Sequence, residues 1–295
     1  MLSSVELAGL RDLALDAALA AGAEIRHASN AGFEVVKSKE GDSLASQVLT
    51  EVDLACDRLL RNKLLPSTLD GNIALLTEEQ PDDGARFDRD FFWCVDPIDG
   101  TLAFTRGQPG YAVSIGLTRR DGVPVVGVVY DPSTDKLYDA VIGQGVRVNG
   151  EAAGERKVDE GQLVVPVDDS LLERRDFAEI EELLHELATR MKLQGVRQRH
   201  NAGAVMSAIW ACESACGCYF KLPKPQPGGG SLWDFAATAC IAKEWGANVT
   251  DFYNQPLDLN NSQTTYMNGA GVVLATNSGL AASLRSGLLD RVSSQ

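Results

Sequence analysis

Acidic residues stand at three points of this 295-residue sequence where an apolar run ends or a helical pattern begins. Glu78 and Glu79 follow one apolar run, Asp96 and Asp99 close the next, and Asp234 follows a glycine run and a tryptophan. Carboxylates at the ends of buried strands repel one another and lose hydration unless cations compensate them. Mg²⁺ is a hard cation that prefers such oxygen ligands. The three clusters therefore predict a divalent-metal site assembled from distant parts of the chain.

The segment from Asp96 to Thr101 has a backbone suited to such a site. Pro97 fixes φ, Gly100 permits a tight turn, and Ile98 between the two aspartates can offer its carbonyl oxygen to the same metal. Thr101 would begin a short helix, whose free N–H groups suit a phosphate oxygen. Two neighbouring metal ions can polarise a phosphate and deprotonate a water for in-line attack. The predicted chemistry is therefore hydrolysis of a phosphate ester.

Three motifs together resemble a known group of proteins. Asp-Pro-Ile-Asp-Gly-Thr at 96–101, with Glu-Glu at 78–79 and Trp-Asp-Phe-Ala-Ala at 233–237, is similar to the signature set of the inositol monophosphatase superfamily. Thr-Glu-Val-Asp at 50–53 and Ala-Val-Ser-Ile-Gly at 112–116 extend the similarity over most of the chain. That group includes inositol monophosphatases, 3'-phosphoadenosine 5'-phosphate phosphatases and relatives of fructose-1,6-bisphosphatase. The resemblance implies an α+β fold, the layered αβαβα sandwich of the sugar-phosphatase type.

The resemblance also implies a Mg²⁺-dependent phosphoric monoester hydrolase that uses two or three ions and is inhibited by lithium. Its metal ligands would be Glu78, Asp96, Asp99, Asp234 and the carbonyl of Ile98. Its catalytic residues would be Glu78, Thr101 and Asp53, with Thr101 and Asp53 orienting or activating the attacking water and Glu79 supporting the outer metal shell. Its phosphate and substrate contacts would be Gly100, Thr101, Gly203 and Asp234.

Structural roles remain open for several of these acids. Asp53 stands three residues after Thr50, a spacing close to a capping box. Asp234 suits a helix start, where the macrodipole favours a carboxylate. Glu78 and Glu79 could form a solvated turn. A relative that binds metal and phosphate without catalysis also remains an alternative.

The stretch from Lys221 to Pro227 departs from the inositol monophosphatase pattern, because it has no acid where a glutamate is expected to receive sugar hydroxyls. Lys221 and Lys224, with Arg197 and Arg199 upstream, would instead suit a second phosphate group. The substrate predicted from this electrostatic argument is 3'-phosphoadenosine 5'-phosphate, which would make the chain a 3'(2'),5'-bisphosphate nucleotidase. Inositol monophosphate is the alternative, and both lysines could also belong to a solvated loop.

Alternating helix and strand patterns must bring these residues together. Helices are predicted over residues 4–27, from Val52 to just before Pro66, over 171–191, 203–213 and 233–245, and at the C-terminus. Strands are predicted at 73–76, 91–95, 111–118, 123–130, 136–142, 163–167, 218–220 and 272–275, and near Val249. The polar segment 150–161 would separate a metal-binding α+β half (1–155) from an α/β half (156–295) that completes the active site and substrate pocket.

Composition narrows the class of partner. The formal net charge is -14, which disfavours unspecific binding to nucleic acid, and the expected partner is a small phosphorylated metabolite. No stretch approaches the ~20 apolar residues that a membrane-spanning helix needs. Six cysteines are too few for a disulfide scaffold, so a cytoplasmic location is expected. A homodimer is left open.

Overall fold

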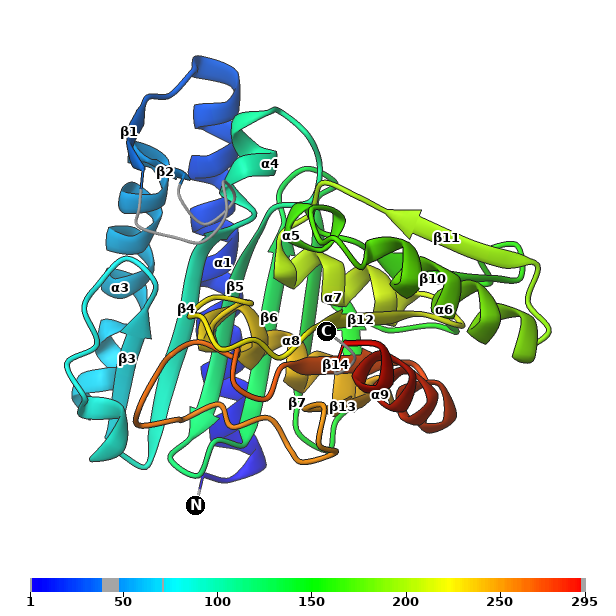
Figure 1. Cartoon of the computed structure of the whole chain (residues 1–295). Coiled ribbons are helices and arrows are strands. Elements are labelled where there is room, and N and C mark those ends of the chain that lie inside the picture. Colours follow the sequence, from blue (N-terminus) through cyan, green and yellow to red (C-terminus); the bar gives the residue numbers. More distant parts are fainter. Residues whose placement is uncertain (1, 39–47, 71, 293–295) are drawn as a thin grey trace.

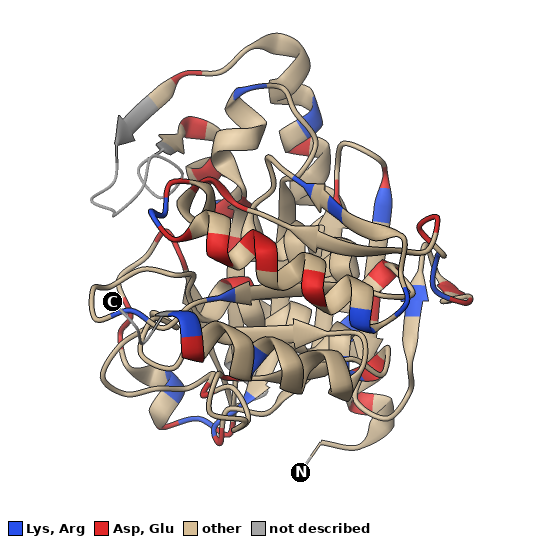
Figure 2. Ribbon diagram, turned by 45° about the vertical axis from the view of Figure 1, so that its right-hand side comes forward, with Lys and Arg blue, Asp and Glu red and all other residues tan. Residues whose placement is uncertain are grey.

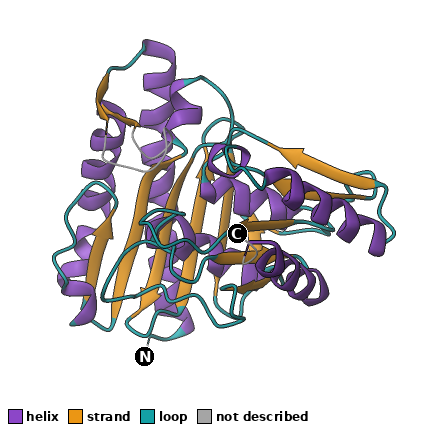
Figure 3. Cartoon of the chain, in the orientation of Figure 1, coloured by secondary structure: helices purple, strands orange, loops and turns teal. Residues whose placement is uncertain are grey.

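Helices and sheets alternate in five layers in the computed structural model of this chain (Figure 1). The structure describes residues 2–38, 48–70 and 72–292. Two long helices cover one face of a seven-stranded sheet, and two shorter helices cover the other face. Smaller sheets and two outer helices follow (Figure 3). Each layer buries its apolar face against the next layer. The predicted α+β class and the layered αβαβα arrangement are confirmed.

The seven-stranded sheet carries two of the predicted acidic clusters at its strand ends. In spatial order its strands are β3 (Ile73–Thr77), β4 (Phe91–Asp99), β5 (Ala112–Arg119), β6 (Pro124–Asp131), β7 (Lys136–Val141), β8 (Val146–Val148) and β9 (Glu151–Ala152). β3 runs parallel to β4, and the later pairs are antiparallel. Helices cover both faces of the central strands, which is why these strands read as continuous apolar runs in the sequence.

The first face of the sheet packs against α1 (Ser4–Ala31) and α3 (Glu51–Asp70). α1 begins with a capping box, in which the Ser3 hydroxyl accepts from the Glu6 N–H and the Glu6 carboxylate accepts from the Ser3 N–H. The predicted end of α3 before Pro66 was wrong, because the helix continues past this residue. The ring removes one helical hydrogen bond, but the Ser67 hydroxyl donates to the Leu64 carbonyl and helps to hold the last turn.

The opposite face packs against α7 (Ala204–Glu213) and α8 (Leu232–Glu244). α8 lies very close to the sheet because glycines stand beneath it. A Cβ at Gly127 of β6 would lie 2.4 Å from the Ala237 carbonyl oxygen of α8. Glycine therefore sets the depth of α8 and, with it, the position of the acidic residue at its N-terminus.

The second half of the chain supplies the outer layers. They contain β10 (Gln162–Pro166), β11 (Gly195–Arg199), β12 (Cys218–Lys221), β13 (Asn248–Thr250), β14 (Val272–Ala275), α5 (Asp169–Leu172), α6 (Phe177–Arg190) and α9 (Ser278–Val292). β10 and β11 pair in parallel, whereas β12, β14 and β13 form an antiparallel sheet. The helix predicted over 171–191 is in fact two helices, and at the break the Asp176 carboxylate accepts two bonds from Arg174. The sequence did not predict β11, whose residues are polar and partly exposed.

Four short elements complete the described chain: β1 (Val35–Ser38), β2 (Val48–Thr50), the 3₁₀ turn η1 (Ala85–Phe87) and α4 (Thr101–Thr105). Within the described ranges, no helix combines the length and apolar character that crossing a bilayer requires. Figure 2 shows basic segments scattered among acidic ones along the ribbon rather than gathered in one place.

Candidate active site

A cavity of about 650 Å³ opens where β4, β10 and β12 end and α7 and α8 begin. Because β3 and β4 are parallel, their carboxyl ends meet at the same edge of the sheet. This places Glu78, which follows β3, beside the same cavity as Asp96 and Asp99 at the end of β4. Asp234 reaches the cavity from the first turn of α8. The structure thus brings together acids from all three sequence clusters.

A bulge at the end of β4 separates its two aspartates. Asp96 pairs with Ser114 and Asp99 with Ala112, so the ladder shifts register between them. The bulge contains Pro97, which cannot donate a ladder hydrogen bond. The Ile98 N–H instead donates to the Asp96 carboxylate at 3.0 Å. Both carboxylates consequently reach the same cavity from one strand.

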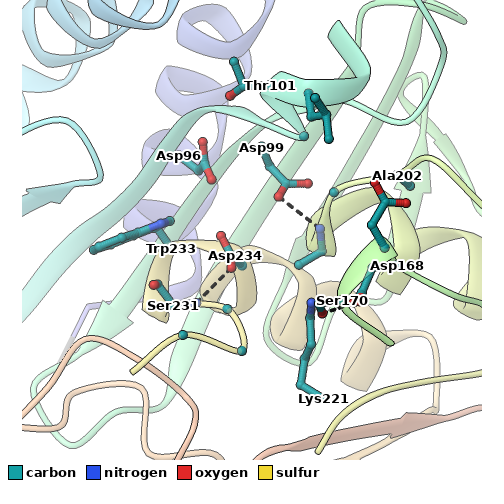
Figure 4. Close-up of a pocket in the computed structure, with 18 of the residues that line it drawn as sticks. Asp96, Asp99, Thr101, Asp168, Ser170, Ala202, Lys221, Ser231, Trp233 and Asp234 are labelled. Carbon is teal, nitrogen blue, oxygen red and sulfur yellow. Dashed lines mark hydrogen bonds and ion pairs between the residues drawn. The ribbon is translucent and has the colours of Figure 1, made fainter. Parts of the chain in front are cut away.

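Helix N-termini orient the other acidic side chains. The Asp99 carboxylate accepts hydrogen bonds from the N–H groups of Ala204 (3.0 Å) and Val205 (2.9 Å), the first residues of α7. The Asp234 carboxylate accepts from the Ser231 N–H at 2.8 Å in the capping box of α8. Each helix dipole favours the negative charge placed there. The helix-start role considered for Asp234 is therefore real, and the same side chain also faces the cavity (Figure 4).

Asp96, Asp99 and Asp234 form the carboxylate cluster. All three are buried, and one oxygen from each lies within 4.8 Å of the others. Burial and the neighbouring Asp234 charge raise the pKa of Asp99 well above its usual range. Burial and the Glu78 charge raise the pKa of Asp234 to about 6. Buried like charges at this spacing fit a divalent cation, and an all-oxygen donor set suits Mg²⁺.

Thr101 and Asp53 meet beside this cluster. The Thr101 hydroxyl lies 3.0 Å from the Asp53 carboxylate and 3.0 Å from the Ile98 carbonyl, so it has two possible acceptors. The other Asp53 oxygen accepts from the Thr50 N–H at 2.8 Å. Asp53 therefore fills the capping position that its spacing suggested and also contacts Thr101. Burial raises the pKa of Asp53, although its hydrogen bonds act in the opposite direction.

Close packing against neighbouring atoms explains why glycine occupies two positions of the site. Gly100 has a φ of +80°, and a Cβ there would lie 2.6 Å from the Gly110 carbonyl oxygen. Gly203 precedes α7, and a Cβ there would lie 2.2 Å from the Asp99 carboxylate. Both glycines line the cavity. Side chains at these positions would displace Asp99 or the turn that leads into Thr101.

Beside the carboxylate cluster, two ion pairs form what we call the ion-pair wall: Lys221 with Asp168, and Arg106 with Asp169. The Lys221 Nζ lies 2.5 Å from Asp168 Oδ2, and an Arg106 nitrogen lies 3.7 Å from Asp169. All four side chains line the cavity. Burial would lower the pKa of Lys221, but the Asp168 charge and hydrogen bond, together with the nearby Tyr219 and Asp234, raise that pKa above its usual range. The wall therefore carries two positive and two negative charges.

The sequence model of the Inositol monophosphatase family matches residues 6–288. The chain belongs to the inositol monophosphatase family. Inositol monophosphatase 2 of Solanum lycopersicum is 34% identical over 262 residues, which span 84% of this chain and 89% of that protein. The 3'(2'),5'-bisphosphate nucleotidase CysQ of Shigella flexneri is 28% identical over 239 residues, 78% of this chain and 90% of that protein. The solved inositol monophosphatase of Anabaena (Nostoc) sp. PCC 7120 has a similar fold (TM-score 0.67, 24% identity, 98% and 99% coverage).

The family assignment confirms the resemblance inferred from the sequence motifs. Membership of the inositol monophosphatase family does not by itself show which lysine and arginine side chains of this chain line the cavity. Lys221 lines the cavity, whereas Lys224 is not among the described residues that line it. Arg197 pairs with Asp159 at 3.4 Å outside the cavity. The Arg199 guanidinium stacks 3.7 Å from the centre of the Trp210 ring and borders a separate hollow.

The cavity residues that the sequence reasoning missed include Arg106, Asp168, Asp169 and Tyr266. Asp168 had a usable signal, because it directly follows the predicted strand 163–167, as Glu78 follows its own strand. Arg106 and Tyr266 had none, since each lies in a loop whose course depends on tertiary packing. Tyr266 is held beside the glycine loop because the Met267 N–H donates to the Gly230 carbonyl at 2.9 Å.

Proposed function

We propose that this member of the inositol monophosphatase family is a Mg²⁺-dependent phosphomonoesterase that hydrolyses a small phosphorylated metabolite. The observation that carries the proposal is the carboxylate cluster itself. Three buried aspartates with oxygens within 4.8 Å of one another border the same cavity as Glu78 and Thr101. Without a cation, such a cluster is unfavourable for folding. A bound cation would neutralise the carboxylates and so explain why they lie together.

The residues that would hold Mg²⁺ are Glu78, Asp96, Asp99, Asp234 and the carbonyl of Ile98. When bound, two or three such ions would neutralise phosphate charge and lower the pKa of a coordinated water. Thr101 would accept a hydrogen bond from the attacking water while donating its own proton to Asp53. Asp53 has the raised pKa that suits a group receiving a proton. Gly100 and Thr101 N–H groups would hold phosphate oxygens, and Gly203 would keep room for Asp99.

The leaving group would lie against the ion-pair wall. This wall has a formal charge of zero, and it offers both donors and acceptors, as the hydroxyl groups of an alcohol require. Arg197, Arg199 and Lys224 are not among the described residues that line the cavity, which weighs against three of the four cations behind the bisphosphate prediction. We therefore favour a substrate with an uncharged, hydroxyl-rich leaving group, for which inositol monophosphate is the test compound.

A second candidate substrate is 3'-phosphoadenosine 5'-phosphate, the compound predicted from the sequence. Lys221 and Arg106 both line the cavity and favour it, since either cation could contact a second phosphate. Each would first have to exchange its carboxylate partner for that phosphate. This exchange makes the bisphosphate the less favourable of the two substrates.

Phosphate release from a substrate panel tests the proposal. The panel contains inositol 1-phosphate, 3'-phosphoadenosine 5'-phosphate and fructose 1,6-bisphosphate, each assayed with Mg²⁺ and with EDTA. We expect Mg²⁺-dependent release, inhibition by lithium, and the highest kcat/KM for inositol 1-phosphate. The bisphosphate nucleotide as the best substrate would favour the second candidate. Mg²⁺ binding without release from any compound would overturn the catalytic assignment and favour a binding protein.

A further inference from the structure

The partly buried ion pair between Lys221 and Asp168 has a geometry that the proposed hydrolysis does not require. Lys221 closes β12 and Asp168 follows β10, so the pair joins two sheets at the edge of the cavity. The two side chains are 16% and 15% exposed, and Figure 4 shows both beside the carboxylate cluster. Two charged side chains that lose most of their hydration do so at a cost, so the pair is weak evidence of a purely stabilising role.

The two Asp168 oxygens have separate partners. Oδ1 accepts hydrogen bonds from the Leu171 N–H (2.9 Å) and the Ser170 hydroxyl (2.6 Å), which fixes the start of α5. Oδ2 accepts from Lys221 at 2.5 Å. The aspartate is thus held in place from one side and presents its second oxygen to the lysine. A second phosphate that approached Lys221 would meet an ammonium group that is already paired and a carboxylate that repels it.

We propose that Asp168 is a specificity-determining residue, which engages Lys221 and so withholds this cation from a second phosphate on the substrate. The inference rests on the proposed phosphatase function and extends it. Asp168 makes the site prefer monophosphates whose leaving group is uncharged. Lys221 would otherwise be a cavity-lining cation available to a bisphosphate.

Substitutions can separate this role from a structural one. Asp168→Asn keeps an oxygen that can cap α5, because asparagine is as good an N-cap as aspartate, but it removes the negative charge. Lys221→Met alone leaves Asp168 without its cation, and the double variant removes both charges together. The charge of the pair is therefore zero in the unmodified protein, +1 in Asp168→Asn, -1 in Lys221→Met and zero in the double variant. Asp159→Asn, whose partner Arg197 lies outside the cavity, is the matched control.

The readout is the ratio of kcat/KM for a bisphosphate to kcat/KM for a monophosphate with the same skeleton. Adenosine 3',5'-bisphosphate with adenosine 3'-phosphate, and inositol 1,4-bisphosphate with inositol 1-phosphate, are suitable pairs. We expect Asp168→Asn to raise this ratio about ten- to a hundredfold, the effect of one charge-assisted contact. The double variant and Asp159→Asn should keep the ratio of the unmodified protein. A ratio unchanged in Asp168→Asn, or raised equally in the double variant, would overturn the inference.

A binding measurement keeps the inference testable if no compound is hydrolysed. Calorimetric titration with adenosine 3',5'-bisphosphate, with Ca²⁺ present to neutralise the carboxylates, reports affinity without turnover. We expect Asp168→Asn to bind at least about tenfold more tightly than the unmodified protein, and the double variant to lose that gain. No turnover with this binding pattern would refute only the phosphatase proposal. Turnover without any change in the ratio or in binding would refute only the role of Asp168.

Discussion

Replacing Asp234 with asparagine should stabilise the metal-free protein while removing metal binding. Burial and the Glu78 charge raise the pKa of Asp234 from an ordinary 3.8 to about 6. A group whose pKa is higher in the folded state adds stability below its unfolded pKa and loses that contribution as the pH rises through its folded pKa. A shift of about 2 units corresponds to roughly 3 kcal/mol at about 1.4 kcal/mol per unit. Metal-free protein should therefore lose up to this amount between pH 4 and pH 7.

The assay is urea unfolding in EDTA at pH 4.5 and pH 7.5. Asp234→Asn cannot ionise, and its side-chain oxygen can still accept from the Ser231 N–H. At pH 7.5 we expect the variant to exceed the unmodified protein in free energy of unfolding by about 1–3 kcal/mol, with a smaller difference at pH 4.5. Added Mg²⁺ should stabilise only the unmodified protein.

Asp131→Asn is the matched control, because Asp131 is also buried but accepts hydrogen bonds from the Ser133 N–H and the Ser133 and Thr134 hydroxyls. This control should destabilise the protein at both pH values. An Asp234→Asn variant that is less stable than the unmodified protein at pH 7.5 in EDTA would refute the reasoning, since the cluster would then carry no electrostatic strain.

Three further predictions concern catalysis, packing and the pocket. Thr101→Val should lower kcat about 10²–10⁴-fold, because it removes the hydroxyl that contacts Asp53. Thr101→Ser keeps the hydroxyl and should retain most of the activity. Equal rates in the two variants would exclude a role for this hydroxyl. Gly127→Ala should lower the free energy of unfolding by about 1–3 kcal/mol, because the added Cβ would meet α8. Gly154→Ala is the control in the same urea assay and should be near neutral, since no atom lies within 4 Å of the added Cβ. Lys224→Ala should change kcat/KM for every panel substrate by less than about twofold, since Lys224 is not among the described cavity-lining residues; a selective loss on bisphosphates would contradict its placement.

The sequence predicted the layered fold because its central strands are buried on both faces and therefore appear as uninterrupted apolar runs. Glu78, Asp96 and Asp99 could be singled out without tertiary information, because they stand where apolar runs of the sequence end. Pro66 was misread as a helix end, because a proline within a helix is disfavoured but tolerated when neighbouring groups compensate. The break between α5 and α6 was also missed, although the four charged residues at 173–176 interrupt the apolar spacing there.

Tertiary contacts, which the sequence does not encode locally, decided which cations reach the cavity. Arg197 and Arg199 lie two residues apart on β11, an edge strand that was not predicted, and their partners are Asp159 and Trp210. Lys221 reaches the cavity as expected, but its partner Asp168 follows β10, a strand of a different sheet. A count of positive charges in this part of the sequence therefore included cations that do not line the cavity.

Titration of Mg²⁺ into the unmodified protein and into Asp96→Asn, with phosphate release as the readout, tests the central claim most directly. Asp96 contributes an oxygen to the carboxylate cluster, and asparagine keeps its size and an oxygen that can accept from the Ile98 N–H. We predict saturable Mg²⁺-dependent release by the unmodified protein and a kcat lower by about 10³-fold or more in Asp96→Asn, with its far-UV circular dichroism unchanged. Comparable Mg²⁺-dependent activity in the folded Asp96→Asn variant would contradict the assignment of this cluster as the catalytic metal site.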